Sequence, residues 1–243
     1  MTSKRPVATL RFATLPDYTT NLDTLVTALE SLPSNAVVVA PEVCLTGFDY
    51  EHFDAAAAFA QKALERLLAL PGEQILVLTM IERREDGIYN VAKVLHRGRV
   101  VHEQAKVKLF KLGDEHSHFS PGSEEEIVPF EIEGIRLGIL ICFELRFKSL
   151  WQQLEGCDII AVPAQWGRLR SEHFVTLSEA LAVMNQCYVL ASDAANEETS
   201  GQSGIISPFG AVQRNGNVLC LEGEYSQKEV QRMRRYLDVG ING

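Results

Sequence analysis

Short apolar runs alternate with segments of helical periodicity along the chain. Four of these runs have the length and composition of strands: residues 7–13, 36–42, 74–82 and 158–164. Residues 21–32 and 54–70 instead carry apolar side chains three and four positions apart, which predicts helices that end at Pro33 and Pro71. The same spacing predicts a helix from Ser171 onward. Strands that alternate with helices favour an α/β protein.

The middle of the chain departs from this alternation. Residues 89–108 contain two strand-like runs around Arg97-Gly98-Arg99, which predicts an antiparallel hairpin and therefore a mixed sheet. Residues 112–126 are polar over a length that is unusual for a loop in a compact domain, so we expect them to cover or line a site. Further strand-like runs and a basic amphipathic tail follow: residues 127–142, 188–194, 203–213, 216–223 and 226–240.

Length and charge narrow the class of protein. A chain of 243 residues with 46% hydrophobic and 23% charged residues predicts one domain over 1–243 with a large core. The net charge of -9 argues against nucleic acid or an anionic membrane as a partner, because both need a positive surface. No apolar run reaches the roughly 18 residues of a membrane span, and the N-terminus lacks a signal-peptide pattern. We therefore expect a cytoplasmic protein.

The cysteines and histidines give no sign of a metal or of a disulfide framework. The five cysteines are odd in number and widely spaced, without a CxxC pair. The six histidines lack the spacing of metal ligands. We expect free thiols in a reducing compartment, no metal and no cofactor.

Three polar residues follow apolar strand-like runs: Glu42, Lys106 and Cys142. Such strand ends are where α/β proteins build sites. A thiol nucleophile, a carboxylate that carries protons and a positive charge for an oxyanion are the parts needed to hydrolyse an amide. Each residue also has a structural explanation by itself: a small buried hydrophobe, a solvated lysine or a loop glutamate. The pattern alone leaves both interpretations open.

Six motifs in a fixed order favour the catalytic interpretation of these three residues. They are APEVCLTGFDY, YNVAKVLHRGRVVHEQAKVKLF, HFSPG, GILICFELRF, DIIAVPAQW and GQSGIISPFG. Together they resemble the nitrilase superfamily of carbon-nitrogen hydrolases over about residues 7–215. The resemblance implies a four-layer α-β-β-α sandwich, with two mixed β-sheets flanked by helices, and a Glu-Lys-Cys triad.

The resemblance also implies roles for individual residues. Cys142 corresponds to the nucleophile, Glu42 to the general base, and Lys106 with the backbone N–H of Phe143 to the groups that bind the oxyanion. Lys108 is the competing lysine, because a strand period of two places it on the same face as Lys106. We prefer Lys106 because the family's lysine precedes a position that is commonly His, which Lys108 would occupy.

A second glutamate often precedes the family's F-x-P-G turn, and Glu115 stands four residues before Phe119. We expect Glu115 to orient Lys106 or the substrate amide; the alternative is that it is one more acid of an acidic loop. The sequence also departs from the family pattern. Glu144 stands where Asp is usual, Lys148 stands where Pro is usual, and ALAVMN lacks the usual charges.

The motifs do not name the substrate, because loops around the shared triad set specificity. We expect Phe143, Trp166 and Arg168 to contact it. Arg168 and Arg170 leave two interpretations open: one of them binds a substrate carboxylate through paired N–H donors, or each is a surface arginine. A small carboxamide is preferred over an N-carbamoyl compound or a nitrile, since most branches of the family hydrolyse amides or N-carbamoyl compounds and true nitrilases tend to carry longer C-terminal extensions. The resemblance further implies a homodimer.

Two readings from other classes remain. His116, His118 or His173 would act as the base in a Cys-His hydrolase, and replacing each of them would reveal it. A non-catalytic binding scaffold of the same fold is the second alternative, motivated by the altered ALAVMN segment.

Overall fold

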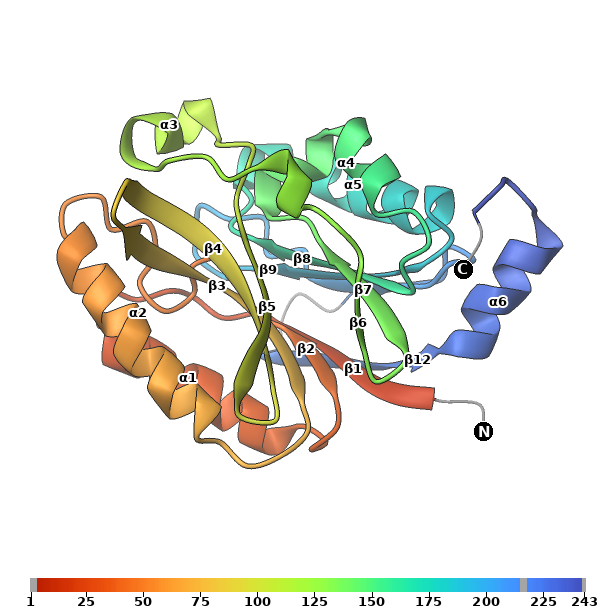
Figure 1. Cartoon of the computed structure of the whole chain (residues 1–243), viewed down its shortest axis with the longest axis horizontal. Helices are drawn as coiled ribbons and strands as arrows, with labels where there is room; N and C mark the ends of the chain where they lie inside the picture. Colours follow the sequence, from red (N-terminus) through yellow and green to blue (C-terminus); the bar gives the residue numbers. More distant parts are fainter. Residues whose placement is uncertain (1–3, 215–217, 242–243) are drawn as a thin grey trace.

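The computed structural model describes residues 4–214 and 218–241, in which two six-stranded sheets stack face to face between helices (Figure 1). The first sheet has the order β12-β1-β2-β3-β4-β5, formed by Cys220–Ser226, Lys4–Leu10, Val37–Val39, Ile75–Arg84, Gly87–His96 and Arg99–Ala105. The second has the order β11-β10-β9-β8-β7-β6, formed by Val212–Arg214, Gly204–Ile206, Tyr188–Asp193, Ile159–Ala164, Ile135–Ile139 and Phe130–Ile132.

Helices cover the outer face of each sheet. Helices α1 (Tyr18–Ser31) and α2 (Phe53–Leu68) lie against the first sheet, and α4 (Lys148–Gln153) and α5 (Ser171–Met184) lie over the second (Figure 1). Helix α6 (Gln227–Tyr236) follows β12 at the side of the molecule (Figure 1). The predicted four-layer α-β-β-α sandwich is confirmed.

Both sheets are mixed, as the hairpin predicted. Strands β1, β2 and β3 are parallel, and β4 and β5 extend that sheet in antiparallel fashion. In the second sheet β7, β8 and β9 are parallel, with antiparallel strands on either side. Side chains that follow the carboxyl ends of parallel strands gather at one edge of a sheet. Glu42 follows β2 and Cys142 follows β7, each three residues after the strand ends.

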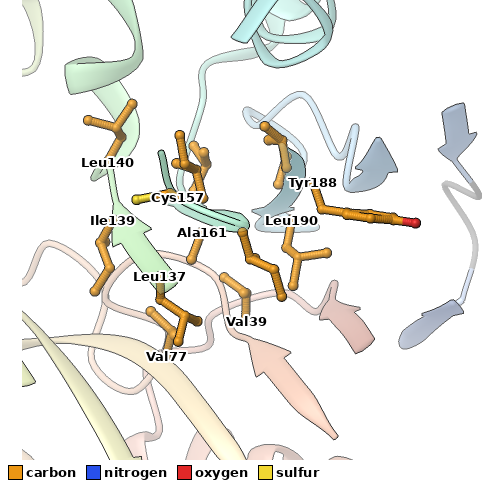
Figure 2. Packing of buried hydrophobic residues seen from close by; sticks show 14 of the residues in the cluster. Val39, Val77, Leu137, Ile139, Leu140, Cys157, Ala161, Tyr188 and Leu190 are labelled. Carbon is orange, nitrogen blue, oxygen red and sulfur yellow. The ribbon is translucent and has the colours of Figure 1, made fainter. Parts of the chain in front are cut away.

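The strand period of two divides the apolar side chains between two interfaces. Val37 and Val39 point into the core between the sheets, whereas Val38 points to the helices α1 and α2. Figure 2 shows Val39 and Val77 of the first sheet facing Leu137 and Leu190 of the second. This apolar contact between the sheets holds β2 and β7 together, and hence the two segments that carry Glu42 and Cys142.

Two segments differ from the sequence-based prediction. Residues 203–213 form two strands rather than one, because Ser207 and Ala211 bond across a turn in which Gly210 has a positive φ of 78°. The polar loop 112–126 contains a one-turn helix, α3 (Glu115–His118), that buries Glu115. Part of the predicted strand 216–223 lies outside the described residues. Within the described ranges, none of the helices combines the length and hydrophobicity needed to cross a membrane.

Candidate active site

The candidate nucleophile stands in a strained turn. After β7 the chain enters a 3-10 turn, Cys142–Arg146, and Cys142 itself has a positive φ of 48°. Val43, directly after Glu42, also has a positive φ, 41°, which is costly for a β-branched residue. The backbone N–H of Val43 donates to Thr79 Oγ1 at 2.6 Å, which helps to hold this conformation. Backbone strain therefore occurs at both segments that deliver a candidate catalytic side chain.

Glu42 is fully buried and held from three directions. Its Oε1 accepts from Lys106 Nζ at 2.7 Å and from Asn90 Nδ2 at 2.8 Å. Its Oε2 accepts from the backbone N–H of Gln165 at 3.2 Å. Beyond the effect of burial, Glu42 also raises the pKa of the Cys142 thiol, because its negative charge disfavours the ionised form of the thiol. The three hydrogen bonds fix the position of the carboxylate.

Lys106 connects the two glutamates. Its Nζ lies 2.7 Å from Glu42 Oε1 and 2.8 Å from Glu115 Oε1, without exposure to solvent. Glu115 Oε2 accepts from the backbone N–H of Phe110, which anchors α3 over the site. Lys108 instead forms an ion pair with Glu124 near the surface. The structure thus brings Glu42, Lys106, Glu115 and Cys142 together and places Lys108 elsewhere.

The glycine of the HFSPG motif has a structural reason. Gly122 donates its N–H to the backbone carbonyl of Lys106 at 2.9 Å. A Cβ at position 122 would lie 2.4 Å from the carbonyl oxygen of Ala105, which is too close for any side chain. The turn can therefore approach the end of β5, and fix the lysine backbone, only with glycine at this position.

Burial and charge set the protonation states of the site. Burial raises the pKa of the Cys142 thiol well above its ordinary value, and Glu42 raises it further while Lys106 opposes the rise. Burial by itself would lower the pKa of Lys106, but Glu42 and Glu115 outweigh it and raise that pKa. Burial also raises the pKa of Glu115, against the effect of Lys106. The resting site therefore contains a neutral thiol beside a permanent ammonium, and the thiol needs a base when it reacts.

A pocket of about 360 Å³ leads to the sulfur of Cys142. Its aromatic lining consists of Phe48, Tyr50, Phe110, Phe143 and Trp166. Glu42 and Lys106 are fully buried behind the thiol. Phe143 and Trp166 thus both line the pocket next to Cys142.

Two arginines line the pocket, together with the carboxylates of Glu115 and Glu198. Arg146 lies over the ring of Trp166 at 4.9 Å and donates to His173 Nδ1, and Arg170 lies over the ring of Phe110 at 5.0 Å. Partial burial and the neighbouring charge of Arg170 lower the pKa of Arg146. Among residues 4–214 and 218–241, neither guanidinium has a carboxylate within 4.0 Å. Arg168 is exposed and lies outside the pocket lining.

The sequence analysis did not single out Asn90, and it considered Arg146 for structural contacts near the cysteine turn rather than for the pocket. Both lie inside recognised motifs, YNVAKV and CFELRF, and that position was the only available signal. Asn90 is buried on β4, which is separated from β2 by β3 in the same sheet, and it contacts Glu42 because Glu42 lies beyond the end of β2. No local pattern reports such a contact.

The histidines have other partners. His116 and His118 lie within 4.0 Å of Asp114, and the ring of His118 also stacks on Tyr50. His173 accepts a hydrogen bond from Arg146. Glu42, and none of these three histidines, is among the groups that shift the pKa of the Cys142 thiol. Within the described ranges, no group of three or more His, Cys, Asp or Glu side chains could hold a metal ion.

Comparisons with known proteins show the family to which the chain belongs. Residues 7–218 match the family model of the carbon-nitrogen hydrolases. The chain is 31% identical to 2-oxoglutaramate amidase of Bacillus subtilis over 191 residues, which cover 74% of this chain and 73% of that protein. It is 31% identical to omega-amidase YafV of Escherichia coli K12 over 192 residues, or 76% of this chain and 73% of that protein.

Solved structures show the same fold at lower identity. XC1258 of Xanthomonas campestris, a CN-hydrolase superfamily protein, superposes with a TM-score of 0.84 at 21% identity and covers 99% of this chain and 97% of its own. A cysteine-to-alanine variant of the Nesterenkonia AN1 amidase superposes with a TM-score of 0.80 at 20% identity, covering 96% and 94%. The chain therefore belongs to the carbon-nitrogen hydrolase family, the nitrilase superfamily, and the relatives most informative about its chemistry are amidases.

Proposed function

We propose that the protein hydrolyses a small carboxamide to a carboxylic acid and ammonia through a thioester on Cys142. One observation carries the proposal: a buried ammonium, Lys106, joins Glu42 and Glu115 at 2.7 and 2.8 Å beside a thiol that opens into a pocket. A nucleophile, a base that contacts it and a fixed positive charge are what acyl transfer requires.

Acylation begins when Cys142 Sγ attacks the amide carbonyl carbon and its proton passes to Glu42. The raised pKa of the thiol makes this transfer necessary, because little thiolate exists before the substrate binds. Lys106 and the backbone N–H of Phe143 stabilise the oxyanion of the tetrahedral intermediate. Glu42 then donates its proton to the departing nitrogen, the C–N bond breaks, and ammonia leaves a thioester behind.

Deacylation repeats the same proton movements with water. Glu42 accepts a proton as the water oxygen bonds to the thioester carbonyl carbon, and Lys106 again stabilises the oxyanion. The C–S bond then breaks, the carboxylic acid leaves, and the proton on Glu42 returns to the sulfur. Lys106 keeps its charge throughout, since two carboxylates raise its pKa.

We propose further that the amide carries a carboxylate at its far end. Arg146 and Arg170 line the pocket without a carboxylate partner among the described residues, and a guanidinium binds a carboxylate through paired N–H groups. The two relatives at 31% identity are named for 2-oxoglutaramate and for omega-amides, which agrees with such a substrate. An N-carbamoyl amino acid also has a carboxylate and is the first alternative; a nitrile is the second.

The test is ammonia release from a panel of the monoamide of glutaric acid, 2-oxoglutaramate, pentanamide, N-carbamoyl amino acids and nitriles. We expect release from the carboxylate-bearing amides by the parent and only background release by Cys142→Ala. Arg170→Gln should raise the KM for the monoamide about tenfold or more, since it removes a charged hydrogen bond, and should leave pentanamide hydrolysis unchanged. Arg168→Gln is the matched control, because its side chain is exposed outside the pocket.

Each arm has an outcome that contradicts the proposal. Release that persists in Cys142→Ala would exclude the thioester. Parental silence with every amide, with no acylated Cys142 by mass spectrometry, would favour the binding scaffold. A larger effect of Arg168→Gln than of Arg170→Gln would move the carboxylate site to Arg168.

We also propose a homodimer that pairs through an apolar patch at the ends of α5 and α6. The patch comprises Val183, Met184, Phe209, Tyr236 and Leu237, all of them exposed. It is continuous, since the rings of Phe209 and Tyr236 lie 6.3 Å apart and Gly210 lies against Val183. Contiguous exposed apolar surface of this kind marks protein interfaces.

The cysteines support a cytoplasmic location. All five are free thiols. Burial raises the pKa of Cys44, Cys157 and Cys187, which suits them to packing rather than to reaction. Fractionation of cells that express the protein checks this proposal, and recovery from a secreted fraction would contradict it.

A further inference from the structure

We propose that Glu144 is a positioning residue that holds the nucleophile turn in register with the lysine-bearing segment. The inference rests on the proposed function for the roles of Cys142 and Lys106. Glu144 is not part of the pocket lining. It acts through the backbone N–H groups of the residue before Cys142 and of the residue after Lys106.

The carboxylate of Glu144 bridges two chain segments. Its Oε2 accepts from the backbone N–H of Ile141 at 2.7 Å, and its Oε1 accepts from the backbone N–H of Val107 at 2.6 Å. Ile141 directly precedes Cys142, and Val107 directly follows Lys106. Glu144 is fully buried, so both hydrogen bonds are protected from water.

Both segments need such a support. Cys142 has a positive φ, a conformation that persists only when its surroundings impose it. On the other side, Lys106 lies just past the end of β5, where its backbone still bonds Asn90 and Gly122 but the chain then leaves the sheet. Glu144 takes up the next N–H group. One side chain therefore fixes the separation between the sulfur and the ammonium.

The length of the side chain matters. The family usually has Asp here, and glutamate is longer by one methylene, or about 1.5 Å of reach. A shortened carboxylate keeps its charge but cannot keep both hydrogen bonds unless one of the segments moves. Because a displacement of about 1 Å can cost a hundredfold in rate, the reach of Glu144 should appear in catalysis and not only in stability.

Burial opposes the ionisation of Glu144, and the groups around its carboxylate offset only part of this effect. Burial raises the pKa of Glu144 to about 7, while hydrogen bonds from the Ile141 and Val107 backbone, the charge of Lys106 and the backbone of Lys108 oppose the rise. When Glu144 is protonated, one oxygen becomes a donor that faces an N–H group. An amide at this position would present a donor in the same way at every pH.

The experiment compares Glu144→Gln and Glu144→Asp with the parent and with Asp158→Asn. Asp158 is a matched control: it is also a buried carboxylate, and its Oδ2 accepts from the backbone N–H of Arg136 at 3.0 Å, but it lies outside the pocket lining. The rate of alkylation of Cys142 by iodoacetamide is followed by peptide mass spectrometry, with the partly exposed Cys220 as internal reference. Thermal melting, kcat and KM are measured on the same samples.

We expect Glu144→Gln to slow alkylation of Cys142 and to lower kcat by about tenfold or more each, with KM within about twofold of the parent. Glu144→Asp should fall between the two, and Asp158→Asn should alter melting without altering alkylation. With both proteins measured at pH 6, the ratio of the parental rate to the Glu144→Gln rate should approach one, because protonation of Glu144 removes the same hydrogen bond.

Parental alkylation of Cys142 in a folded Glu144→Gln protein would overturn the inference, whatever its activity. An equal loss of Cys142 alkylation in Asp158→Asn would also overturn the inference, since the slower alkylation would then follow from general destabilisation. If Glu144→Gln does not fold, Glu144→Asp provides the test with the charge retained, and parental alkylation there would overturn the inference. Absence of amide hydrolysis in the parent would refute the proposed function and leave the alkylation test intact.

Discussion

At the scale of single residues, the positive charge of Lys106 is stabilised by two carboxylates of the protein instead of by water. Two carboxylates lie within 2.8 Å of its Nζ, and none of its surface is exposed. Breaking a buried ion pair by removing one partner commonly costs about 3–5 kcal/mol, because a charge remains buried without compensation. An exposed pair contributes only about 0–1 kcal/mol. We therefore expect Lys106 and Lys108 to differ in how much each contributes to the free energy of unfolding.

We predict that Lys106→Ala abolishes measurable turnover and lowers the free energy of unfolding by about 3 kcal/mol. Lys108→Ala should retain most of the activity and change stability by less than about 1 kcal/mol, because its ion pair with Glu124 lies near the surface. Urea unfolding and ammonia release measure both quantities. Equal loss of activity in the two variants would contradict the assignment of Lys106.

At the scale of elements, the wall of the pocket depends on a carboxylate at the end of β9. Asp193 Oδ1 accepts from the backbone N–H of Trp166, after β8, at 2.7 Å. Its Oδ2 accepts from Gly201 N at 2.8 Å and from the hydroxyl of Ser200. Asp193 thus ties together the loops that follow two neighbouring strands. Its burial raises its pKa to about 7.

This raised pKa predicts how stability depends on pH. Between the ordinary pKa of 3.8 and about 7, the folded state binds one proton more than the unfolded state, so the contribution of Asp193 to stability is fully present at low pH and is lost as pH rises through about 7. Asp193→Asn lacks this titration. The stability of the parent relative to the variant should therefore fall by about 2 kcal/mol between pH 5 and pH 8. Denaturation with urea at both pH values measures the difference, and a constant difference would show that Asp193 ionises normally.

At the scale of the whole molecule, the proposed homodimer would pair through the exposed apolar patch of Val183, Met184, Phe209, Tyr236 and Leu237. We predict that the parent sediments with twice the 27.0 kDa mass of one chain and that Met184→Glu sediments as a monomer, since a buried unpaired charge opposes association. Val101→Glu, on the edge strand β5 and 44% exposed, is the matched control and should remain dimeric. A monomeric parent at micromolar concentration, or a dimeric Met184→Glu variant, would exclude this interface.

Much of the fold could be predicted because its elements are encoded in local patterns. The buried run 74–82 and the helical spacing in 21–32 and 54–70 report which side chains face a core, and the structure has β3, α1 and α2 at those places. The turn at Gly210 was missed, since a continuous apolar run conceals a reversal of the chain that the backbone conformation decides.

Part of the candidate site could likewise be predicted from the sequence, and part could not. The strand-end pattern alone left the roles of Glu42, Lys106 and Cys142 open, and the resemblance of the ordered motifs to the nitrilase superfamily selected these three residues and Glu115 as candidates. Which arginine lines the pocket could not be predicted: Arg168 and Arg170 occupy the same 3-10 turn two positions apart, and only the direction of the chain after β8 turns Arg170 inward.

The sequence by itself determined the α/β layers and the chemical groups available at the strand ends, because both depend on periodicity and residue type along short segments. Only the tertiary structure decided which groups act on one another. Asn90 reaches Glu42 across 48 positions and Glu144 reaches Val107 across 37, and the thiol pKa depends on burial by the whole fold. Distances and dielectric environment arise when two sheets close on a common core, and no short segment contains that information.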